Sequence, residues 1–397
     1  MPGYERYDHL ERKELMDVIE SGIFMRYGFD GMRNGHWKAK EMEAAICQKT
    51  GAKYCHLMSS GTAALHATFA ALGVGAGDEV IMPVFTFVAS FETILQAGAT
   101  PVLVDINETL CLDPAAVERA ITPRTKVVMP VHMCGAMAQL DALEAICKKH
   151  NIILLEDACQ AFGGTFLGKY LGAIGDAGCF SFDFVKTVTC GEGGAMVTNS
   201  AELYERAAQF SDHGHDHAGV DRGADLHPCM GVNYRISELH AAVGLGQIKK
   251  LDHFLHLQRR NHAILQQALA TIPQVTFRTI PDPQGDTATF LSFFLPDENT
   301  TRKAAQALKE VGIDGVFYYY DNNWHYIRNW HHLKEVHTMM PLSVALTDFL
   351  TQAGKKSYPA SDAIMSREIS LAIKMGWSIE ETQTRAKKCV SAIQSVL

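Results

Sequence analysis

The chain has 397 residues, a length that predicts two or three domains and a large buried core. Hydrophobic residues make up 47% and charged residues 20% of it, which are ordinary values for a globular protein. Acidic residues (44) outnumber basic residues (36), and the net charge of −8 argues against nucleic acid as a partner, because nucleic acid attracts basic surfaces.

The cysteines and the first residues of the chain indicate the cellular compartment of the protein. Ten cysteines occur singly between Cys47 and Cys389, and no C-x-x-C pair is present, so zinc ribbons and thioredoxin chemistry are not expected. The first residues, MPGYERYDHLERKE, are charged and lack the apolar core of a signal peptide. We therefore predict a cytoplasmic protein with reduced thiols.

Residues 1–50 predict two helices around an irregular connection. Helical spacing covers 9–21 and 38–50, and the segment between them is rich in glycine and aromatic residues. Strands and helices then alternate. The predicted strands are 54–58, 79–82, 101–105, 126–131 and 152–156, and the predicted helices are 61–72, 88–97, 114–121 and 140–150. This alternation predicts a parallel sheet covered by helices on both faces, with ligands bound beyond the carboxyl ends of the strands.

The stretch 80–104 contains a single charged residue, Glu92, and is long enough to span a bilayer. Pro83 and Pro101 interrupt it, and Gly98 lies near its end. A strand, a buried helix and a second strand are therefore the preferred interpretation, and no membrane segment is expected.

Beyond residue 177 the pattern changes. CFSF (179–182) and GAMVTN (194–199) predict two strands joined by a loop, and a long helical region follows over 237–270. Strand-like segments at 276–280 and 289–295 then precede a helix at 301–311. We expect a large domain over 1–255, with a helical arm at its start, and a smaller α/β domain over 256–397.

Four polar segments lie at predicted strand ends. SSGT (59–62) begins a helix, where free N–H groups and the helix dipole favour phosphate, although an ordinary helix cap explains this segment alone. EDACQ (156–160) follows an apolar strand and places a carboxylate at the sheet edge, or caps a helix. GVNYR (231–235) precedes the long helix and, alone, reads as a turn.

The fourth segment, SFDFVK (181–186), ends in a lysine just beyond an apolar strand. A lysine amine that is partly desolvated becomes nucleophilic and can form a Schiff base. Taken alone, Lys186 is more simply a surface lysine whose stem packs on apolar residues. Together, the four segments supply what pyridoxal phosphate (PLP) requires: an amine, a carboxylate for the pyridine nitrogen, a phosphate cradle and a group against the ring face.

From about residue 20 to residue 255 the chain resembles the sugar aminotransferases of the DegT/DnrJ/EryC1/StrS family, members of aminotransferase fold type I. Seven segments occur in the order and at the spacing of that family, and together they outweigh the simpler interpretation of each one. These segments are SSGTAAL (59–65), PVFTFVAS (83–90), VLVDI (102–106), PVHMCG (130–135), LLEDACQAFGG (154–164), GDAGCFSFDFVKTVTCGEGGAMVTN (175–199) and GVNYRISELHAAVGLGQ (231–247).

The resemblance implies a role for each matching residue. Lys186 is expected to hold PLP covalently and to move the proton, and Asp157 to bind the pyridine nitrogen. Gln160 matches the contact to the ring hydroxyl, and Phe87 matches the aromatic residue stacked on the ring. A lysine at position 186 favours transamination, because some sugar dehydratases of the family carry histidine there.

The resemblance also implies a phosphate site and an assembly. Gly61, Thr62 and Ser181 match the phosphate cradle. Asn233 matches an asparagine that reaches the cofactor of the neighbouring subunit, which implies a homodimer with shared active sites. The expected partners are therefore a sugar acceptor and an amino-acid donor, with glutamate as the expected donor.

The last 140 or so residues depart from the common family pattern. FYYYDNNWHYIRNWHHLKE (317–335) either faces the substrate or forms a partly buried hinge. No metal site is expected at His325, His331 and His332, because acidic or cysteine partners do not cluster there. HGHDH (213–217) is interpreted as a mobile loop with exposed histidines rather than as a metal site.

The acceptor is predicted from the same unusual regions. GFDGMRNGHW (28–37), the MPGYE start and the C-terminal third resemble the branch that aminates C8 of 8-oxo-3-deoxy-manno-octulosonate for lipopolysaccharide. In that case Arg26, Arg33 or Arg235 is expected to meet the substrate carboxylate. The alternatives are a nucleotide-linked 4-keto or 3-keto deoxysugar as acceptor, a dehydratase or aromatic-forming reaction, and a regulatory protein on the same scaffold. A nicotinamide dehydrogenase is excluded, because no G-x-G-x-x-G follows the first strand.

Overall fold

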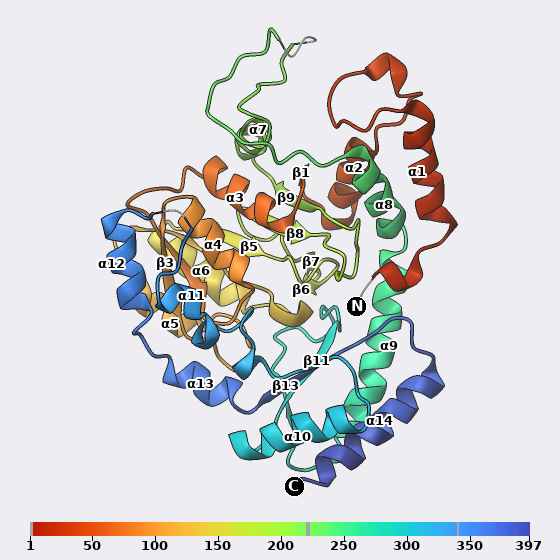
Figure 1. Ribbon diagram of the computed structural model, residues 1–397, viewed down its shortest axis with the longest axis vertical. Coiled ribbons are helices and arrows are strands. Elements are labelled where there is room, and N and C mark those ends of the chain that lie inside the picture. Colours follow the sequence, from red (N-terminus) through yellow and green to blue (C-terminus); the bar gives the residue numbers. More distant parts are fainter. Residues whose placement is uncertain (1–2, 220–222, 340) are drawn as a thin grey trace.

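The computed structural model describes residues 3–219, 223–339 and 341–397, so residues 1 and 2 of the MPGYE start lie outside the described residues. Its centre is a seven-stranded sheet with the order β1-β9-β8-β5-β4-β2-β3 (Figure 1). The strands are β1 (Tyr54–Met58), β2 (Glu79–Pro83), β3 (Thr100–Val104), β4 (Thr125–Val128), β5 (Ile153–Asp157), β8 (Ala177–Ser181) and β9 (Gly194–Thr198). β9 runs antiparallel to both neighbours, and the other adjacent pairs are parallel.

Helices cover both faces of this sheet. The connecting helices are α3 (Gly61–Ala71), α4 (Val88–Gln96), α5 (Pro114–Ala120) and α6 (Leu140–His150), and α7 (Ala201–Phe210) follows β9. Parallel crossovers are right-handed, and the chain reverses direction across the sheet after β3, so α5 and α6 lie opposite to α3 and α4. α3 accordingly packs against α4, and α5 against α6. The predicted α/β class is confirmed.

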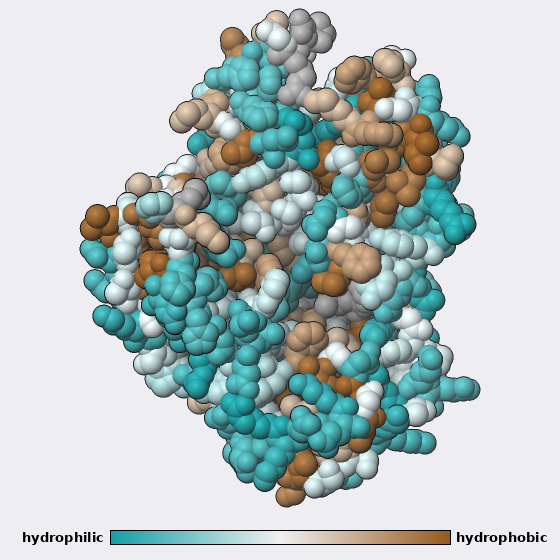
Figure 2. Space-filling view, in the orientation of Figure 1, coloured by the Kyte–Doolittle hydropathy of each residue, from teal (hydrophilic) through white to brown (hydrophobic). Residues whose placement is uncertain are grey.

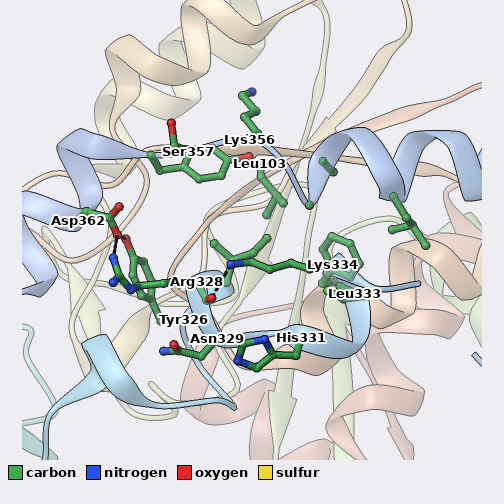
Figure 3. Close-up of a pocket in the computed structure, with 16 residues that line it drawn as sticks. Leu103, Tyr326, Arg328, Asn329, His331, Leu333, Lys334, Lys356, Ser357 and Asp362 are labelled. Atoms are coloured by element: carbon green, nitrogen blue, oxygen red, sulfur yellow. Dashed lines mark hydrogen bonds and ion pairs between the residues drawn. The ribbon is translucent and has the colours of Figure 1, made fainter. Parts of the chain in front are cut away.

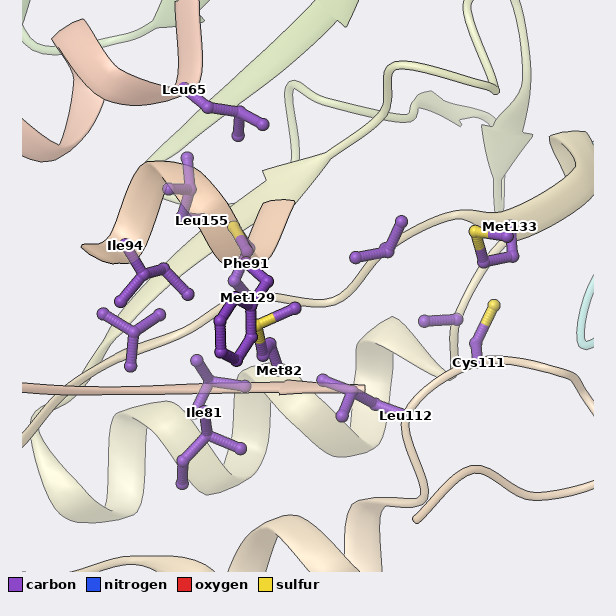
Figure 4. Packing of buried hydrophobic residues seen from close by; sticks show 14 of the residues in the cluster. Leu65, Ile81, Met82, Phe91, Ile94, Cys111, Leu112, Met129, Met133 and Leu155 are labelled. Carbon is purple, nitrogen blue, oxygen red and sulfur yellow. The ribbon is translucent and has the colours of Figure 1, made fainter. Parts of the chain in front are cut away.

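The apolar stretch 80–104 forms β2, α4 and β3, as the sequence predicts. Over the described residues, no helix is both long enough and apolar enough to cross a membrane. These elements belong instead to the core, where Met82, Phe91 and Met129 pack together (Figure 4). Each such fully buried side chain stabilises the fold by about 1.5–3 kcal/mol relative to an exposed one.

The N-terminal helices α1 (His9–Ser21) and α2 (Lys38–Thr50) have the predicted bounds and pack on α8 (Glu238–Ile248). α1 begins with a capping box at Asp8. The buried Lys38 ammonium lies 2.6 Å from Glu14 and 2.7 Å from Asp17, which joins the start of α2 to α1. α8 and α9 (Leu251–Leu269) replace the single long helix expected over 237–270, because the chain bends between residues 248 and 251.

A second, antiparallel sheet has the order β10-β11-β13-β12. Its strands are β10 (Thr276–Phe277), β11 (Phe290–Phe294), β12 (Val316–Phe317) and β13 (Glu368–Ala372). An apolar cluster joins this sheet to α9, α10 (Glu298–Glu310) and α14 (Ile379–Gln394). Residue 255 lies inside α9, and the division of the chain into domains at that point stays a prediction.

The remaining elements are short. The hairpin β6 (Thr165–Phe166) and β7 (Lys169–Tyr170) follows β5, and three helices lie in the C-terminal third: α11 (His331–Lys334), α12 (Val344–Ala353) and α13 (Pro359–Met365). The 3-10 turns are η1 (Gly3–Arg6), η2 (Asp30–Met32), η3 (Met133–Gly135), η4 (Tyr319–Asp321) and η5 (Ile327–Asn329).

Candidate active site

The loop that carries Lys186 leaves the carboxyl end of β8 and returns as β9, with which β8 pairs up to the base of the loop. Residues 182–193 therefore project beyond the sheet. Within this loop, the Lys186 N–H donates to the Asp183 carbonyl at 3.0 Å, and the Asp183 carboxylate accepts from the Val185 N–H at 3.1 Å. These bonds form a tight turn in which Lys186 is partly buried.

Asp157 is the last residue of β5, and its carboxylate is buried. The carboxylate accepts hydrogen bonds from the Ser90 hydroxyl at 2.7 Å and from the Cys159 N–H at 3.1 Å. The Ser90 hydroxyl in turn lies 2.7 Å from the Thr86 hydroxyl, and both are buried. Ser90 and Thr86 thus orient this carboxylate. The only sequence signal for them is two hydroxyl residues four positions apart in PVFTFVAS.

Glu156 points to the other face of the sheet, because side chains alternate along a strand. Its carboxylate accepts from three N–H groups of residues 172–175 at 2.7–2.8 Å, and His132 Nε2 lies 3.0 Å from it. This carboxylate anchors a loop. Of the two acidic residues in EDACQ, Asp157 is therefore the one whose carboxylate meets Ser90.

Gln160 has a defined orientation. Its Oε1 accepts a hydrogen bond from the Cys134 N–H at 3.0 Å. Cys134 has φ of 57°, a left-handed conformation that is uncommon for a residue with a side chain, and this backbone aims its N–H at the Gln160 amide. The NH₂ group of that amide consequently points away from Cys134, as a donor.

Gly61 and Ser181 come into contact although they lie on different elements. Gly61 is the first residue of α3, whose N-cap Ser60 accepts from the Ala63 N–H at 3.0 Å. A Cβ on Gly61 would lie 2.8 Å from the Ser181 Cβ, so only glycine fits without movement. With Thr62 in the first turn of α3, the three residues predicted to cradle a phosphate surround a helix N-terminus, which favours an anion.

Phe87 is partly buried and lies against the aromatic segment 317–335. Its ring centroid is 5.7 Å from that of Trp324, with the planes 27° apart, and 5.5 Å from that of His325. The backbones are also joined, because the Val88 N–H donates to the Trp324 carbonyl at 2.9 Å. The segment therefore lies directly beside the residue expected to stack on the cofactor, and the choice between a substrate-facing segment and a partly buried hinge stays open.

The charge of Lys186 acts on two neighbours. Burial, followed by the positive charge of Lys186, lowers the pKa of His325 to about 4, so this imidazole is neutral at pH 7. Burial and then the Asp157 carboxylate raise the pKa of Cys159 well above its usual value, and the Lys186 charge acts in the opposite direction. The lysine and the carboxylate thus share one electrostatic environment beyond the ends of β5 and β8.

Asn233 has an exposed side chain outside this crevice. Its backbone bridges to Asp212, and its Oδ1 accepts from the Arg235 N–H at 3.4 Å. Arg235 also forms an ion pair with Asp212. Within one chain, these contacts do not link Asn233 to Lys186, and its expected role in the site of a second subunit stays a prediction.

The two N-terminal arginines predicted to meet a substrate carboxylate are buried. Arg26 donates to the Glu43 carboxylate at 2.5 Å. Arg33 donates to two backbone carbonyls at 2.6 and 2.8 Å and lies 3.4 Å from Glu238. Both guanidinium groups therefore already have carboxylate partners within the fold, as Arg235 has.

The histidine-rich segments are arranged as follows. His331 and His332 are exposed. The expectation that the histidines of HGHDH are exposed is wrong for two of them, because His215 is only 12% exposed and His217 stacks on Tyr27 at 4.2 Å. Among residues 3–219, 223–339 and 341–397, no group of three or more His, Cys, Asp or Glu side chains is arranged to hold a metal ion.

A separate cavity of about 440 Å³ is lined by residues 326–334 of the aromatic segment together with residues of α4, β3, α12 and α13 (Figure 3). The Tyr326 hydroxyl donates to Asp362 at 2.8 Å, and Arg328 lies 3.8 Å from the same carboxylate. Lys334 donates to the Arg328 carbonyl at 2.6 Å. These bonds hold in place the segment that presents His325 to Phe87.

The residues present fit PLP. The helix N-terminus at Gly61 leaves no room for a side chain, the Asp157 carboxylate is buried and oriented, and Lys186 supplies an amine in the same environment. Together with the mostly parallel sheet and its one reversed strand, this grouping defines a PLP-dependent enzyme of aminotransferase fold type I.

The chain belongs to the DegT/DnrJ/EryC1/StrS aminotransferase family, whose model matches residues 9–389. It is 42% identical over 294 residues to the L-glutamine:2-deoxy-scyllo-inosose aminotransferase of Streptoalloteichus tenebrarius, covering 70% of this chain and 68% of that protein. The structure of 3-amino-5-hydroxybenzoic acid (AHBA) synthase is 30% identical, with a TM-score of 0.81 over 98% of this chain and 97% of that one.

NtdA from Bacillus subtilis, solved with bound pyridoxamine phosphate, is 25% identical to this chain. Its TM-score is 0.79, over 99% of this chain and 84% of NtdA. The expected fold type, cofactor and enzyme class are thereby confirmed: the chain is a PLP-dependent aminotransferase. The alternative of a non-catalytic regulatory protein is set aside.

Proposed function

We propose that this enzyme transfers an amino group from L-glutamate or L-glutamine to a keto or aldehyde carbon of a sugar or a related carbocycle. The observation that carries the proposal is that Asp157 and the Gly61–Ser181 contact lie at the carboxyl ends of the adjacent strands β5 and β8, where the loop of Lys186 begins. The family membership and the inosose aminotransferase among its relatives support the acceptor class.

Each residue has a proposed task. When bound, PLP withdraws electrons from the carbon that carries the amino group and thereby makes its hydrogen acidic. Lys186 Nζ holds the cofactor and moves that proton, and Asp157 keeps the pyridine nitrogen protonated. The α3 N-terminus at Gly61 and Thr62, with Ser181, binds the phosphate. Gln160 donates to the ring hydroxyl.

The remaining wall of the site belongs to Phe87 and its aromatic neighbours. We propose that Phe87 stacks on the cofactor ring. Trp324 is 58% exposed beside it, and an aromatic face of this kind packs on the apolar face of a sugar ring. The neutral His325 imidazole can both donate hydrogen bonds to hydroxyls and accept hydrogen bonds from them.

Two acceptors are proposed, one from the sequence and one from a relative. C8 of 8-oxo-3-deoxy-manno-octulosonate is the acceptor that the unusual termini suggest, in lipopolysaccharide biosynthesis. Arg26, Arg33 and Arg235 are each paired with a carboxylate, which leaves that substrate's own carboxylate without the partners expected for it. An uncharged cyclic ketone, as in the name of the inosose aminotransferase, needs no such partner.

We also propose a homodimer in which Asn233 completes the neighbouring site. Five apolar residues of α1 and the following segment are between 48% and 59% exposed, and Figure 2 shows apolar residues gathered over this part of the molecule. They are Met16, Ile19, Phe24, Phe29 and Met32. A contiguous apolar surface of this kind marks an interface. The ten free cysteines agree with the proposed cytoplasmic location.

A screen of donors and acceptors tests the proposed function. The holoenzyme is mixed with glutamate or glutamine alone, and the visible absorbance should change as the cofactor takes up the amino group. An inosose-type cyclic ketone, the 8-oxo octulosonate and a nucleotide-linked 4-keto sugar are then added separately, and one of them should restore the original spectrum. Two half-reactions in one site predict ping-pong kinetics. An unchanged spectrum with every donor contradicts the proposal.

The 30% identity to AHBA synthase favours one second candidate, an aromatic-forming or dehydrating reaction with the same cofactor. Such a reaction needs no amino donor. Release of water or of an aromatic product from a cyclic ketone, with no spectral response to glutamate or glutamine, would identify it.

A further inference from the structure

The first turn of the chain, η1 (Gly3–Arg6), lies against the loop that carries Lys186. The Gly3 N–H donates to the carbonyl oxygen of Lys186 itself at 2.9 Å. One residue further on, the Tyr4 ring stacks on Phe184, with ring centroids 4.4 Å apart and planes within 5°. Two consecutive residues of η1 thus contact the Lys186 loop, one through the backbone and one through a side chain.

Gly3 occupies a space that leaves no room for a side chain unless its surroundings move. A Cβ at this position would lie 2.1 Å from Gln247 Oε1 and 2.4 Å from the Thr187 carbonyl oxygen. Gln247, on α8, is fully buried and donates to the Gly3 carbonyl at 3.3 Å and to Glu11 at 2.6 Å. The backbone of Gly3 is therefore held between α8 and the residue that follows Lys186.

The other half of η1 is attached to the second sheet. The Gly376 N–H donates to the Glu5 carboxylate at 2.9 Å, and Arg6 donates to the Met375 carbonyl at 2.7 Å. Residues 375 and 376 lie in the connection between β13 and α14. Lys250, at the start of α9, donates to the Arg6 carbonyl at 2.5 Å. η1 consequently joins the Lys186 loop to two helices and to the second sheet.

We infer that η1 is a positioning clamp that fixes the backbone of Lys186 relative to the other residues of the proposed site. The inference rests on the proposed role of Lys186 as the amine that holds PLP. The loop itself is anchored within its own span by the turn at Asp183, and its outer residues Phe184 and Val185 are half exposed. The Thr187 hydroxyl accepts a hydrogen bond from Gln258 of α9 at 3.3 Å, and the contacts from Gly3 and Tyr4 add a restraint on the outer side of the loop.

Two substitutions test the clamp. Gly3→Ala forces the backbone away from Gln247 and Thr187, and Tyr4→Ala removes the stacked ring without any clash. Gly75→Ala is the matched control, because its Cβ would lie 3.7 Å from the nearest atom, the Ala97 carbonyl oxygen, far from the site. Amide hydrogen exchange of residues 182–190 in cofactor-free protein reports directly on the loop.

We expect exchange in the Lys186 loop to accelerate roughly tenfold in both clamp variants and to stay unchanged in Gly75→Ala, because local opening costs less when contacts are lost. In the loaded enzyme, kcat should fall while the KM for the amino donor changes little. If the amide hydrogens of residues 182–190 exchange at the wild-type rate in folded Tyr4→Ala protein, the inference is wrong. A Lys186→Ala variant that still holds the cofactor covalently would refute the proposed function instead. The result of the hydrogen-exchange experiment does not depend on that outcome, so the two failures can be distinguished.

Discussion

At the scale of single residues, two side chains of the proposed site are held in orientation by hydrogen bonds from neighbouring residues. The Asp157 carboxylate is held by the Ser90 hydroxyl, which itself lies against that of Thr86. Gln160 is oriented by a left-handed Cys134. A buried hydrogen bond to a carboxylate contributes about 1.5–3 kcal/mol, so Ser90 holds the Asp157 carboxylate in a fixed orientation.

Replacement of Lys186 by alanine removes the only amine proposed to hold the cofactor. We expect turnover to fall by at least about 10²–10⁴-fold, the contribution of a positioned acid–base group. The visible absorbance of the variant should disappear after gel filtration, because cofactor bound without a covalent bond is lost. Lys169→Ala, at an exposed position on β7, is the control. Full activity in Lys186→Ala would refute the assignment.

Gly61→Ala tests the phosphate cradle. The new methyl group would lie 2.8 Å from the Ser181 Cβ, so either α3 or the end of β8 must move. Overpacking of this kind costs about 1–3 kcal/mol, which corresponds to roughly a 5- to 150-fold weaker affinity for PLP. Titration of the apoenzyme with PLP measures the change. Gly75→Ala should bind PLP as the wild type does, and equal affinities for both variants would argue against the cradle.

At the scale of secondary-structure elements, the sequence pattern predicts the helices well but does not predict where a long helix is interrupted. α1, α2 and α6 have the predicted bounds, and each ends at a left-handed Gly or Asn, the residue types that favour this C-cap conformation. The expected helix over 237–270 divides into α8 and α9, and both pieces are buried against different partners, α1 and α14. The apolar spacing of a helix continues through the bend between α8 and α9, so the sequence does not show where the bend lies. Its position follows from the different elements that the two helices pack against.

Strand β13 begins with a buried acid, Glu368, which has one oxygen without a hydrogen-bond partner. Burial raises the pKa of Glu368 to about 8, although the Ser370 hydroxyl and the Arg278 charge act to lower it. The ordinary value is 4.5. Between these two pH values the folded state binds more protons than the unfolded state, so the free energy of unfolding should decrease as pH rises from about 5 to 8.

Glu368→Gln should abolish this decline. We expect the variant to gain stability over the wild type by up to about 1.4 kcal/mol per pH unit across this range, since glutamine cannot ionise. Urea denaturation at pH 5, 6.5 and 8 measures it. Glu380→Gln, at an exposed position, is the control. A difference between Glu368→Gln and the wild type that is independent of pH would contradict the assignment.

At the scale of the whole molecule, apolar residues of α1 and of residues 24–32 are about half exposed on the surface (Figure 2). Five apolar side chains half exposed on one surface cost free energy in water, and a second copy of the chain would cover them. The same copy would bring its Asn233 to a neighbouring site. Oligomeric state and activity are therefore expected to be linked.

Ile19→Asp places a charge among these apolar residues, where Ile19 is 53% exposed. We expect the wild type to sediment as a dimer and the variant to dissociate at least roughly tenfold more readily, because a buried charge without a partner is costly. Lys388→Asp, an exposed change on α14, should leave the dimer intact. A wild-type chain that is monomeric at micromolar concentration would refute the proposed dimer.

The sequence by itself determined the α/β class, because strand–helix alternation builds a parallel sheet, and the motifs that match the family determined the cofactor and the proposal of Lys186, Asp157 and Gly61 as site residues. Local spacing cannot report contacts between distant segments. Only the tertiary structure showed that Ser90 orients Asp157, that Gly3 holds the Lys186 backbone, and that Arg26 and Arg33 are already paired. These contacts join residues far apart in the chain, and packing alone decides them.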